Sequence, residues 1–429
     1  MKKIAIIGQG YVGLPLAISF SYHYPVVGYD VDYKRVSQIQ SGLDLTLESS
    51  TDILKEVTRL SKTTNFQKGL QVTTDETLLS DCNIFIITVP TPIDKYNSPD
   101  LSHLISASRT VGKYLKPTDI VIYESTVFPG CTEEDCVPVL EKVSGLVFNH
   151  DFYVGYSPER INPGDKVHTL ENVIKVTSGS NDQIAEEIDQ LYKKIISAGT
   201  YKAPSIKIAE AAKVIENAQR DLNISFVNEL ALIFDKLGID TTEVLNAAGT
   251  KYNFLKYKPG LVGGHCISVD PYYLTHKATK LGYVPEVILS GRRVNNKMGS
   301  FVASKTIKLM LQKDIVVKGA KILILGFSFK ENCPDVRNTS VINIYKELQE
   351  YETNPVVCDP WVDKDLVKRD FYLNIIDFEE VLNEEYDAII LAVAHDLFLG
   401  LDLQSIRADK SVVFDCKSIY PKSAVDARL

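Results

Sequence analysis

The sequence predicts an α/β protein with two doubly wound Rossmann-like domains joined by a central helical domain that contains a long spine helix. Three observations carry this prediction. A glycine-rich turn follows the first apolar run, a helical pattern extends from about residue 204 to residue 237, and apolar runs after residue 320 repeat the order of those near the start. Alternating strand and helix patterns are typical of parallel sheets covered by helices on both faces. We therefore expect domains at 1–200, 201–312 and 313–429.

The size and composition of the chain are those of a multidomain globular protein. Its 429 residues exceed what one hydrophobic core normally organises. The formal net charge of −8, with no basic tail or stripe, argues against a nucleic acid or an anionic membrane as partner. No segment approaches the apolar length that crosses a bilayer. An anionic ligand must then be held by helix N-termini and a few well-placed Lys or Arg side chains.

The cysteines argue against both a disulfide framework and a metal site. The chain has seven of them, an odd number, scattered at positions 82, 131, 136, 266, 333, 358 and 416. None shows the paired short spacing of a zinc site, so no metal is predicted. Scattered thiols indicate a reducing compartment, and we expect the protein to be cytoplasmic.

The first unit carries a dinucleotide-binding signature. A strand at Lys3–Ile7 leads into Gly8-Gln-Gly-Tyr-Val-Gly13, a helix over Leu14–Tyr22 and a strand at Val26–Tyr29 that ends in Asp30. Glycines at this spacing let a pyrophosphate approach the backbone at a helix N-terminus. The acidic residue about 20 positions further on accepts hydrogen bonds from the adenosine ribose, which favours NAD over NADP.

Three further buried strands end in small or polar residues. They are expected at Asn83–Val89, Asp119–Tyr123 and Phe152–Gly155. The segments that follow them are Pro90-Thr-Pro92, Ser125-Thr-Val127 and Ser157-Pro-Glu-Arg160. In an open parallel sheet, ligands bind at the carboxyl ends of the strands. These three ends therefore predict one ligand site.

A long helix is predicted from Pro204 to Leu237. Lys213, Asn217 and Asp221 recur on it at four-residue intervals and form a polar stripe on one face. Most such stripes are solvated faces, and Lys213 would then pair with a neighbouring Glu. The alternative is a spine between domains that directs a Lys and an Asn into a cleft. This alternative is favoured by an apolar opposite face made of Ala212, Ile215, Ala218 and Leu222.

The third segment repeats the pattern of the first. Apolar strands are expected at Lys321–Leu325, Val356–Asp359, Asp387–Val393 and Val412–Cys416, and a glycine, Gly326, again follows the first of them. This pattern predicts a second doubly wound sheet. The third glycine of the signature is missing, so a second full dinucleotide is not expected. Lys330, after the first of these strands, is a candidate contact for a phosphate or a sugar.

Cys266 follows Gly263-Gly-His265 and precedes Asp270 by four residues. The glycines permit close backbone approach and unusual dihedral angles directly before the thiol. A single apolar cysteine is most often an inert core residue. In a dinucleotide-binding protein, however, a thiol can trap the aldehyde made by one oxidation, so that the same site oxidises it again. We therefore interpret Cys266 as a nucleophile and Asp270 as a residue that orients a base or a water.

Taken together, these residues resemble the nucleotide-sugar 6-dehydrogenases of the UDP-glucose dehydrogenase superfamily, over essentially the whole chain. Several independent motifs occur in the order of that family. They are Gly8-Gln-Gly-Tyr-Val-Gly13, Val89-Pro-Thr-Pro92, Glu124-Ser-Thr-Val127, Ser157-Pro-Glu-Arg160, Lys213 with Asn217, Gly263-Gly-His-Cys266 through Asp270, and Phe329-Lys-Glu through Asp335 and Arg337.

Departures from the UDP-glucose enzymes indicate a subgroup. Those enzymes typically have Lys in place of Glu124, Ser in place of His265 and Phe in place of Arg160. The segments 158–164, 254–266 and 291–295 resemble enzymes that act on UDP-N-acetylhexosamines. Among these, the resemblance is greatest to the UDP-N-acetylglucosamine and UDP-N-acetylgalactosamine 6-dehydrogenases of bacterial surface polysaccharide pathways. UDP-N-acetylmannosamine and UDP-glucose remain the alternative substrates.

The resemblance implies oxidation of the sugar C6 hydroxymethyl group to a carboxylate with two NAD+ in sequence. Lys213, or a water held by Asp270, would be the acid–base group. Cys266 would trap the aldehyde as a thiohemiacetal that is oxidised to a thioester. Thr126, Glu159 and Asp270 would activate the hydrolytic water. The Lys213 ammonium and the Asn217 amide would stabilise developing oxyanions.

The resemblance also assigns binding residues to the three domains. Residues 1–200 would bind NAD, residues 201–312 would carry the catalytic cysteine and a homodimer interface, and residues 313–429 would bind the UDP-sugar. Cofactor contacts are expected from Gly8, Gly10, Tyr11, Val12, Gly13, Asp30, Arg35, Val89, Pro90, Thr91, Ser125, Thr126 and Arg337. Substrate contacts are expected from Glu159, Arg160, Asn162, Lys213, Asn217, Tyr257, Lys258, Gly260 and Lys330, and Arg292 and Arg293 are candidates to reach a UDP group across a dimer.

Two other functions compete with this one. A single-step hydroxyacyl or 6-phosphogluconate-type dehydrogenase shares the plan of a Rossmann domain followed by a long helix, but it would yield one NADH per product. A non-catalytic NAD-sensing or scaffold protein could also be derived from this fold. The presence of Cys266, Lys213 and Asn217 argues against it.

Overall fold

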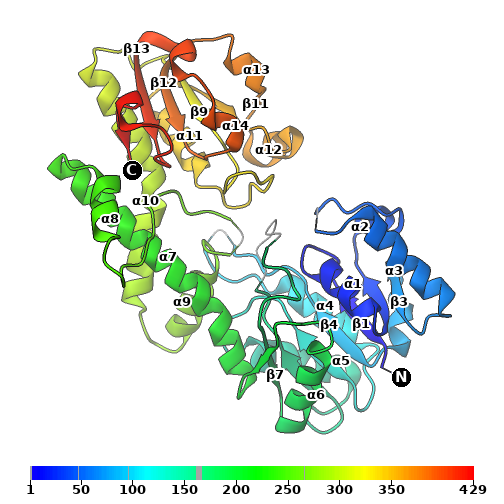
Figure 1. Cartoon of the computed structure of the whole chain (residues 1–429). Helices are drawn as coiled ribbons and strands as arrows, with labels where there is room; N and C mark the ends of the chain where they lie inside the picture. The colour runs from blue at the N-terminus through cyan, green and yellow to red at the C-terminus, as the bar shows by residue number, and fades with distance from the viewer. Residues whose placement is uncertain (1, 47, 95, 161–166, 265) are drawn as a thin grey trace. The chain divides into compact units, whose positions relative to one another are not determined.

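Two β-sheets and one long helix organise the chain, as the computed structural model shows (Figure 1). The structure describes residues 2–46, 48–94, 96–160, 167–264 and 266–429. Two residues singled out from the sequence, Asn162 and His265, lie outside the described residues. The chain divides into a first unit of residues 1–216 with 272–283 and a second unit of residues 217–271 with 284–429. The predicted α/β fold with two doubly wound sheets and a long helix is confirmed.

The sheet of the first unit has eight strands in the order β3-β2-β1-β4-β5-β6-β7-β8. Neighbouring strands are parallel except β6 and β7, which are antiparallel. The first six strands follow the Rossmann order, which reverses direction between β1 and β4. The strands are β1 (Ile4–Ile7), β2 (Pro25–Tyr29), β3 (Gly69–Thr73), β4 (Ile84–Ile87), β5 (Ile120–Tyr123), β6 (Tyr153–Tyr156), β7 (Lys175–Gly179) and β8 (Thr200–Lys202).

Helices cover both faces of this sheet. Alternate strand residues such as Ile4 and Ile84 belong to a core shared with α1, α2, α3 and α6, while α4 packs on β4 and against α5. Because successive side chains of a strand point to opposite faces, continuous apolar runs are required here. The helices are α1 (Gly13–Ser21), α2 (Tyr33–Gln40), α3 (Thr51–Thr63), α4 (Ser102–Gly112), α5 (Val137–Ser144) and α6 (Asp182–Tyr192), with a π-helical turn at Thr132–Cys136 before α5.

The predicted long helix is α7 (Ile206–Leu237), whose first part belongs to the first unit and whose remainder belongs to the second. Its polar stripe is buried rather than solvated: Lys213 and Asn217 are each 7% exposed. On the face expected to be apolar and covered, Ile215 is 53% exposed. The other helices of the central region are α8 (Thr241–Ala248), α9 (Asp270–Lys280) and α10 (Glu286–Gln312).

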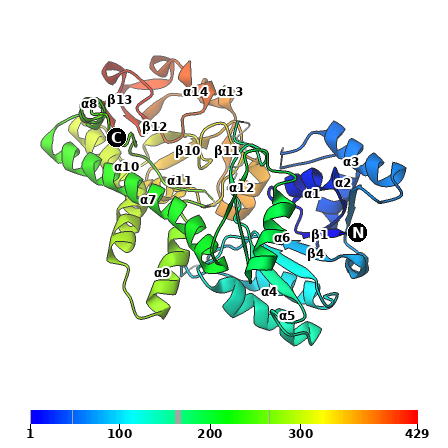
Figure 2. The ribbon, with the colours of Figure 1, turned by 60° about the horizontal axis from the view of Figure 1, so that its bottom comes forward.

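The sheet of the second unit has six parallel strands in the order β11-β10-β9-β12-β13-β14, which is again the Rossmann order. One face packs on α10 and α11, which lie side by side (Figure 2). The other face packs on residues of α13 and α14. The elements are β9 (Lys321–Leu325), α11 (Val341–Glu350), β10 (Asn354–Cys358), α12 (Lys364–Phe371), β11 (Ile375–Ile376), α13 (Phe378–Val381), β12 (Tyr386–Leu391), α14 (Asp396–Leu399), β13 (Arg407–Asp415) and β14 (Ala427–Arg428).

No helix within the described ranges combines the length and the apolar character that crossing a membrane requires.

Candidate active site

The glycine-rich turn after β1 has the shape that a dinucleotide pyrophosphate needs. Gly8 has a positive φ of 95°, and its N–H donates to the Tyr29 carbonyl at 2.8 Å. A Cβ added at Gly10 would meet no atom within 4 Å, so the backbone there is open to a ligand. A Cβ at Gly13 would lie 1.9 Å from the Gly8 oxygen, so glycine is required where α1 packs on the strand. These are the three roles that the signature assigns to its glycines, and the turn therefore fits NAD.

Asp30, at the end of β2, and Arg35, on α2, both contact the backbone of this turn. Asp30 accepts hydrogen bonds from the backbone N–H of Gln9 at 2.7 Å and of Asp32 at 2.9 Å. Arg35 donates from Nε to the Gln9 carbonyl at 2.7 Å and forms an ion pair with Asp44 at 2.8 Å. Arg35 was expected to contact the cofactor. Its bonds to Gln9 and Asp44 show that it also fixes the backbone of the turn.

The ends of β4 and β5 are joined by side-chain hydrogen bonds. Thr91 donates to the Thr126 carbonyl at 2.7 Å, and Ser125 donates to the Val89 carbonyl at 2.6 Å. The Tyr273 hydroxyl, on α9, donates to the Thr91 carbonyl. The predicted cofactor residues at these strand ends, Pro90 included, therefore lie along one edge of the first sheet. This edge lies next to the point between β1 and β4 where the strand order reverses, and ligands bind at such points.

Glu159 and Arg160 follow β6. Glu159 is 8% exposed and accepts a hydrogen bond from the Arg160 N–H at 2.6 Å. The Arg160 guanidinium donates to Glu216 on α7 at 2.6 Å and to the Ile174 carbonyl at 3.0 Å. Arg160 was expected to contact substrate. That contact stays a prediction, and in this structure the guanidinium connects the end of β6 to the helix that carries Lys213.

A buried ion pair lies at the end of β5, directly before Ser125. Glu124 accepts from the Lys175 ammonium at 2.6 Å and from the Tyr192 hydroxyl. Burial raises the pKa of Glu124, the Lys175 charge opposes this rise, and the negative charge of Glu159 adds to it. Sequence reasoning singled out Glu124 but missed Lys175 and Tyr192, because both come from elements remote in the sequence.

The acidic neighbours of Lys213 on α7 are engaged elsewhere. Glu210, completely buried, accepts from the backbone N–H of Gly130 at 2.5 Å and of Thr132 at 2.9 Å. Glu216 is paired with Arg160. The possibility that Lys213 pairs with one of these two residues is therefore not realised. Burial raises the pKa of Glu210 to about 7, against the opposing effect of the hydrogen bonds from Thr132 and Gly130.

In the second unit, Cys266 differs from the other cysteines. All seven lie in the described part of the chain, and Cys266 is partly exposed whereas the other six are buried. Its carbonyl accepts from the N–H groups of Val269 at 3.0 Å and Asp270 at 2.8 Å, at the start of α9. Asp270 in turn accepts from the Asn217 amide at 2.6 Å. Asn217, Asp270 and the backbone of Cys266 are thus directly connected.

The two glycines before Cys266 are required by packing within the second unit. Gly264 has a φ of 88°, and a Cβ there would lie 2.7 Å from the Phe329 ring. The Gly264 N–H donates to the Arg337 carbonyl at 3.1 Å, and its carbonyl accepts from the Asn338 amide at 3.1 Å. Arg337 was expected to contact the cofactor. Its guanidinium forms an ion pair with Asp335, and its carbonyl holds the cysteine segment.

A cavity of about 410 Å³ opens in the second unit. Tyr257 and Lys258, both of which were expected to contact the substrate, line this cavity. Gly260 does not line it, but the Asn228 amide bonds both the N–H and the carbonyl of Gly260, at 2.8 and 3.0 Å. Further aromatic and cationic lining residues were missed. They are Phe254, Lys256 and Lys417, of which Lys417 follows β13 and was detectable as another polar strand end.

Arg292 is buried in a polar network of the second unit. It is 5% exposed, and its guanidinium bonds Asp221 and Asn296, each at 2.6 Å. Asn295 also donates to Asp221 at 2.6 Å. The guanidinium is therefore engaged within the second unit, and the expected contact of Arg292 with a UDP group stays a prediction. Asp221 comes from α7, 71 residues away, whereas Asn296 lies one turn further along α10.

Among the residues that the structure describes, no group of three or more His, Cys, Asp or Glu side chains is arranged to hold a metal ion.

Comparison with known proteins covers nearly the whole chain. The UDP-glucose/GDP-mannose dehydrogenase family matches through its NAD binding domain at residues 2–196, its central domain at 207–297 and its UDP binding domain at 323–422. The chain is 56% identical to UDP-N-acetyl-D-glucosamine 6-dehydrogenase of Salmonella typhi, over 100% of this chain and 98% of that protein. It is 54% identical to the protein of the same name from Pseudomonas aeruginosa, over 100% and 99%. The solved structure of UDP-D-ManNAc dehydrogenase from Pyrococcus horikoshii matches with a TM-score of 0.89 at 31% identity, over 99% and 98% of the two chains.

Proposed function

The chain belongs to the UDP-glucose/GDP-mannose dehydrogenase family, and we propose that it oxidises C6 of a UDP-N-acetylhexosamine to the carboxylate, using two NAD+ per product. It is an NAD-dependent oxidoreductase. The observation that carries the proposal of a double oxidation is the partly exposed Cys266, whose carbonyl is bound by the N–H of Asp270. A thiol is needed only if the aldehyde is retained for a second oxidation.

NAD, when bound on the turn after β1, supplies the hydride acceptor for each oxidation. The residues that would hold it are those whose geometry fits: the open backbone at Gly10, the N-terminus of α1 and the carboxylate of Asp30. The hydrogen bonds that Asp30 accepts from Gln9 and Asp32 fix the orientation of this carboxylate. An ordered acceptor at the end of β2 suits a ribose with a free 2′-hydroxyl.

In the first oxidation, a base takes the proton of the C6 hydroxyl. Lys213 is one candidate, because it is buried and its acidic neighbours on α7 have other partners. A water held by Asp270 is the other. The Asn217 amide, 2.6 Å from Asp270, would keep that carboxylate in one orientation. Groups held in this way lose little freedom when the substrate reacts.

In the second oxidation, the Cys266 thiolate adds to the aldehyde carbon and forms a thiohemiacetal. Loss of hydride converts this adduct into a thioester, and water then releases the carboxylate and the thiol. We assign activation of this water to Glu159, Thr126 and Asp270. The Lys213 ammonium and the Asn217 amide are assigned to the oxyanions that develop in both steps.

The 410 Å³ cavity of the second unit has the chemistry for a uridine diphosphate. Phe254 and Tyr257 offer ring faces for a base, and Lys256, Lys258 and Lys417 offer positive charge for phosphates. This cavity supports the choice of a UDP-sugar within a chain whose net charge is −8. We propose that Lys330 contacts the same ligand.

The names of the relatives favour UDP-N-acetyl-D-glucosamine over the galacto, manno and glucose alternatives. The test is a panel of the four UDP-sugars, with NADH followed spectroscopically and the sugar product quantified. We expect UDP-N-acetylglucosamine to give the highest kcat/KM and two NADH per product. One NADH per product would reject the double oxidation, and a clear preference for UDP-glucose would reject the subgroup. We further propose that the product serves surface polysaccharide synthesis.

We also propose a homodimer in the cytoplasm. On the part of α7 that belongs to the second unit, Phe226, Ile233 and Leu237 are 57%, 46% and 63% exposed and recur on one face of the helix. Large apolar side chains gathered on one helix face are typical of an interface. The proposed chemistry of Cys266 needs a thiol, which a reducing compartment preserves.

A further inference from the structure

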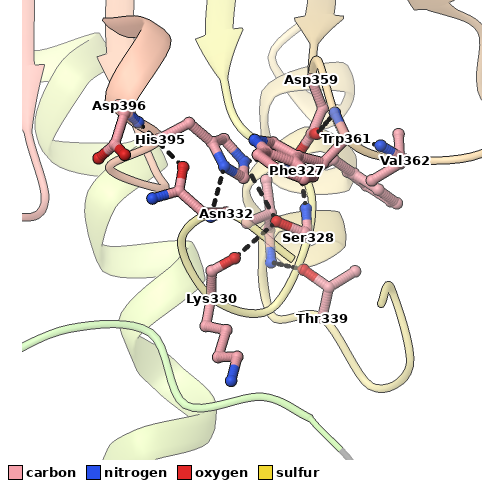
Figure 3. A network of polar contacts seen from close by, with 11 residues as sticks. Phe327, Ser328, Lys330, Asn332, Thr339, Asp359, Trp361, Val362, His395 and Asp396 are labelled. Carbon is pink, nitrogen blue, oxygen red and sulfur yellow. Dashed lines mark hydrogen bonds and ion pairs between the residues drawn. The ribbon is translucent and has the colours of Figure 1, made fainter. Parts of the chain in front are cut away.

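In a doubly wound fold, ligands normally bind at the edge of the sheet where the strand order reverses. In the second sheet, buried side chains of the protein occupy this edge. The strand order reverses between β9 and β12, and ligands bind beyond the carboxyl ends of strands at such a point. Here Ser328, Asp359 and His395 follow β9, β10 and β12, and all three are buried (Figure 3). Hydrogen bonds from this network fix both ends of the turn from Ser328 to Asn332.

Asp359 occupies the position at the end of β10 that Asp30 occupies at the end of β2, but its carboxylate is saturated. Oδ2 accepts from the N–H of Phe327 at 2.7 Å, from that of Ser328 at 2.9 Å and from the His395 ring at 3.0 Å. Oδ1 accepts from the Trp361 N–H at 2.8 Å. Burial alone would raise the pKa of Asp359, but the hydrogen bonds from His395 and from the backbone hold the pKa below its usual value. Asp359 is therefore an internal anchor and not a ribose ligand.

The hydrogen bonds of His395 fix its tautomer. The backbone N–H of Asn332 donates to Nδ1 at 2.9 Å, so Nδ1 carries no proton. The ring proton is then on Nε2, which faces Asp359 at 3.0 Å and the Ser328 hydroxyl at 3.2 Å. The Ser328 hydroxyl donates a hydrogen bond to the Lys330 carbonyl at 2.9 Å. One neutral ring thus joins both ends of the turn to the sheet.

This turn presents Lys330 and continues into the segment that holds the cysteine loop. In Figure 3 the Lys330 side chain extends away from His395 and Asp359. Next to it, the Phe329 ring lies against Gly264, and the backbone of Arg337 bonds Gly264 at 3.1 Å. We propose that His395 is a positioning residue for UDP-sugar binding, which fixes the turn from Ser328 to Asn332 so that Lys330 meets the nucleotide. This inference rests on the proposed function, because that function assigns Lys330 to the substrate.

Two substitutions separate the hydrogen bond at Nδ1 of the ring from the contacts at Nε2. In His395→Asn, the amide oxygen stands near the place of Nδ1 and still accepts from Asn332. In His395→Gln, the amide nitrogen stands near the place of Nε2 and still donates to Asp359, but the acceptor for Asn332 is lost. We expect His395→Gln to raise KM for the UDP-sugar about tenfold with kcat within twofold, a difference of about 1.4 kcal/mol. His395→Asn should stay within about threefold of the wild type, and KM for NAD should change in neither.

The matched control is Thr353→Val. Thr353 is buried just before β10, at the opposite end of the sheet, and donates to the Leu348 carbonyl at 2.8 Å. The Thr353→Val substitution should lower the melting temperature and leave KM unchanged.

A double variant tests whether His395 acts through Lys330. If the two residues act together, His395→Gln should add little to the KM of Lys330→Met. Additive effects, or equal KM for His395→Asn and His395→Gln, would overturn the inference.

Calorimetry with UDP separates this inference from the proposed function, because it requires no turnover. We expect UDP to bind about tenfold more weakly to His395→Gln than to the wild type. Equal affinities would overturn the role of His395 even if the enzyme oxidises its sugar. A wild-type protein that binds UDP without oxidising any of the four UDP-sugars would overturn the proposed function alone.

Discussion

The Asn217 amide donates a hydrogen bond of 2.6 Å to the carboxylate of Asp270, which joins α7 to the first residue of α9. The N–H of Asp270 donates to the carbonyl of Cys266 at 2.8 Å. Two consecutive hydrogen bonds therefore connect α7 to the backbone of the loop that carries the thiol. Both side chains are buried. In the proposed chemistry, the amide stabilises developing oxyanions and the carboxylate holds a water.

Removal of the Asn217 amide should slow the reaction more than it weakens binding. We expect Asn217→Ala to lower kcat about a hundredfold, because an oriented donor to a developing oxyanion is lost and Asp270 is no longer fixed. Steady-state NADH formation measures this. Asn223→Ala, at a half-buried position on the same helix, is the control and should keep kcat within twofold. An unchanged kcat in Asn217→Ala would remove Asn217 from the catalytic set.

Loss of the Cys266 thiol should abolish the second oxidation. We expect Cys266→Ala to lower steady-state turnover at least about a thousandfold, because no covalent adduct retains the aldehyde. Any product that forms should be aldehyde with one NADH each, detectable with a carbonyl reagent. Cys82→Ala removes a buried thiol from the first unit and should cost stability without changing kcat. Turnover unchanged in Cys266→Ala would show that the thiol is not the group that traps the aldehyde.

Cofactor choice should depend on Asp30. We expect Asp30→Ala to raise KM for NAD roughly tenfold, because the ribose loses an acceptor and the Gln9 N–H loses its partner. The preference for NAD over NADP should narrow, since a carboxylate no longer repels the 2′-phosphate. The ratio of kcat/KM for the two cofactors measures this. Asp32→Ala removes only the cap of α2 and should leave that ratio unchanged.

Much of the fold could be predicted from local patterns, because buried parallel strands appear as continuous apolar runs. The strands that carry the glycine turn and the polar ends were found in this way. Short or mixed strands, such as β3 and β8, have exposed positions and were missed. Local patterns also could not reveal that the polar stripe of α7 is buried, because its partners are remote. Asp221, for example, meets Arg292 of α10, 71 residues away.

The same limit applies to the candidate site. Motifs identified Cys266, Asp270 and Asn217, and Asp270 is hydrogen-bonded to both of the others. Residues that act through another side chain have no motif, as His395 illustrates, since its partner Asp359 is 36 residues away. The positive φ of Gly264 could be expected from the residue type, but the ring that requires it, Phe329, could not.

Glu210 should give stability a specific dependence on pH. Burial raises its pKa to about 7 from an ordinary value of 4.5. Because the folded state binds this proton more tightly than the unfolded state, the stabilisation is complete below about pH 4.5 and is lost as the pH rises through about 7. A shift of this size corresponds to roughly 3 kcal/mol. Urea unfolding between pH 5 and pH 8 should show the decrease in wild type.

Glu210→Gln has no proton to lose, so this part of the pH dependence should be absent. The variant should also be less stable than wild type at pH 8, because its amide nitrogen would face a backbone N–H of Gly130 or Thr132. Glu350→Gln, on the exposed end of α11, should keep the wild-type slope. The same slope in Glu210→Gln and wild type would show that another group is responsible.

The exposed apolar face of α7 should hold two chains together. We expect sedimentation equilibrium to give the mass of two chains for wild type and of one chain for the double variant Phe226→Glu with Ile233→Glu. In a symmetric dimer each substitution acts twice, and each buried apolar side chain contributes about 1.5–3 kcal/mol, so dissociation should increase at least a thousandfold. Val316→Glu, at a position 76% exposed and away from α7, should remain dimeric. A double variant that sediments as two chains would place the interface on another surface.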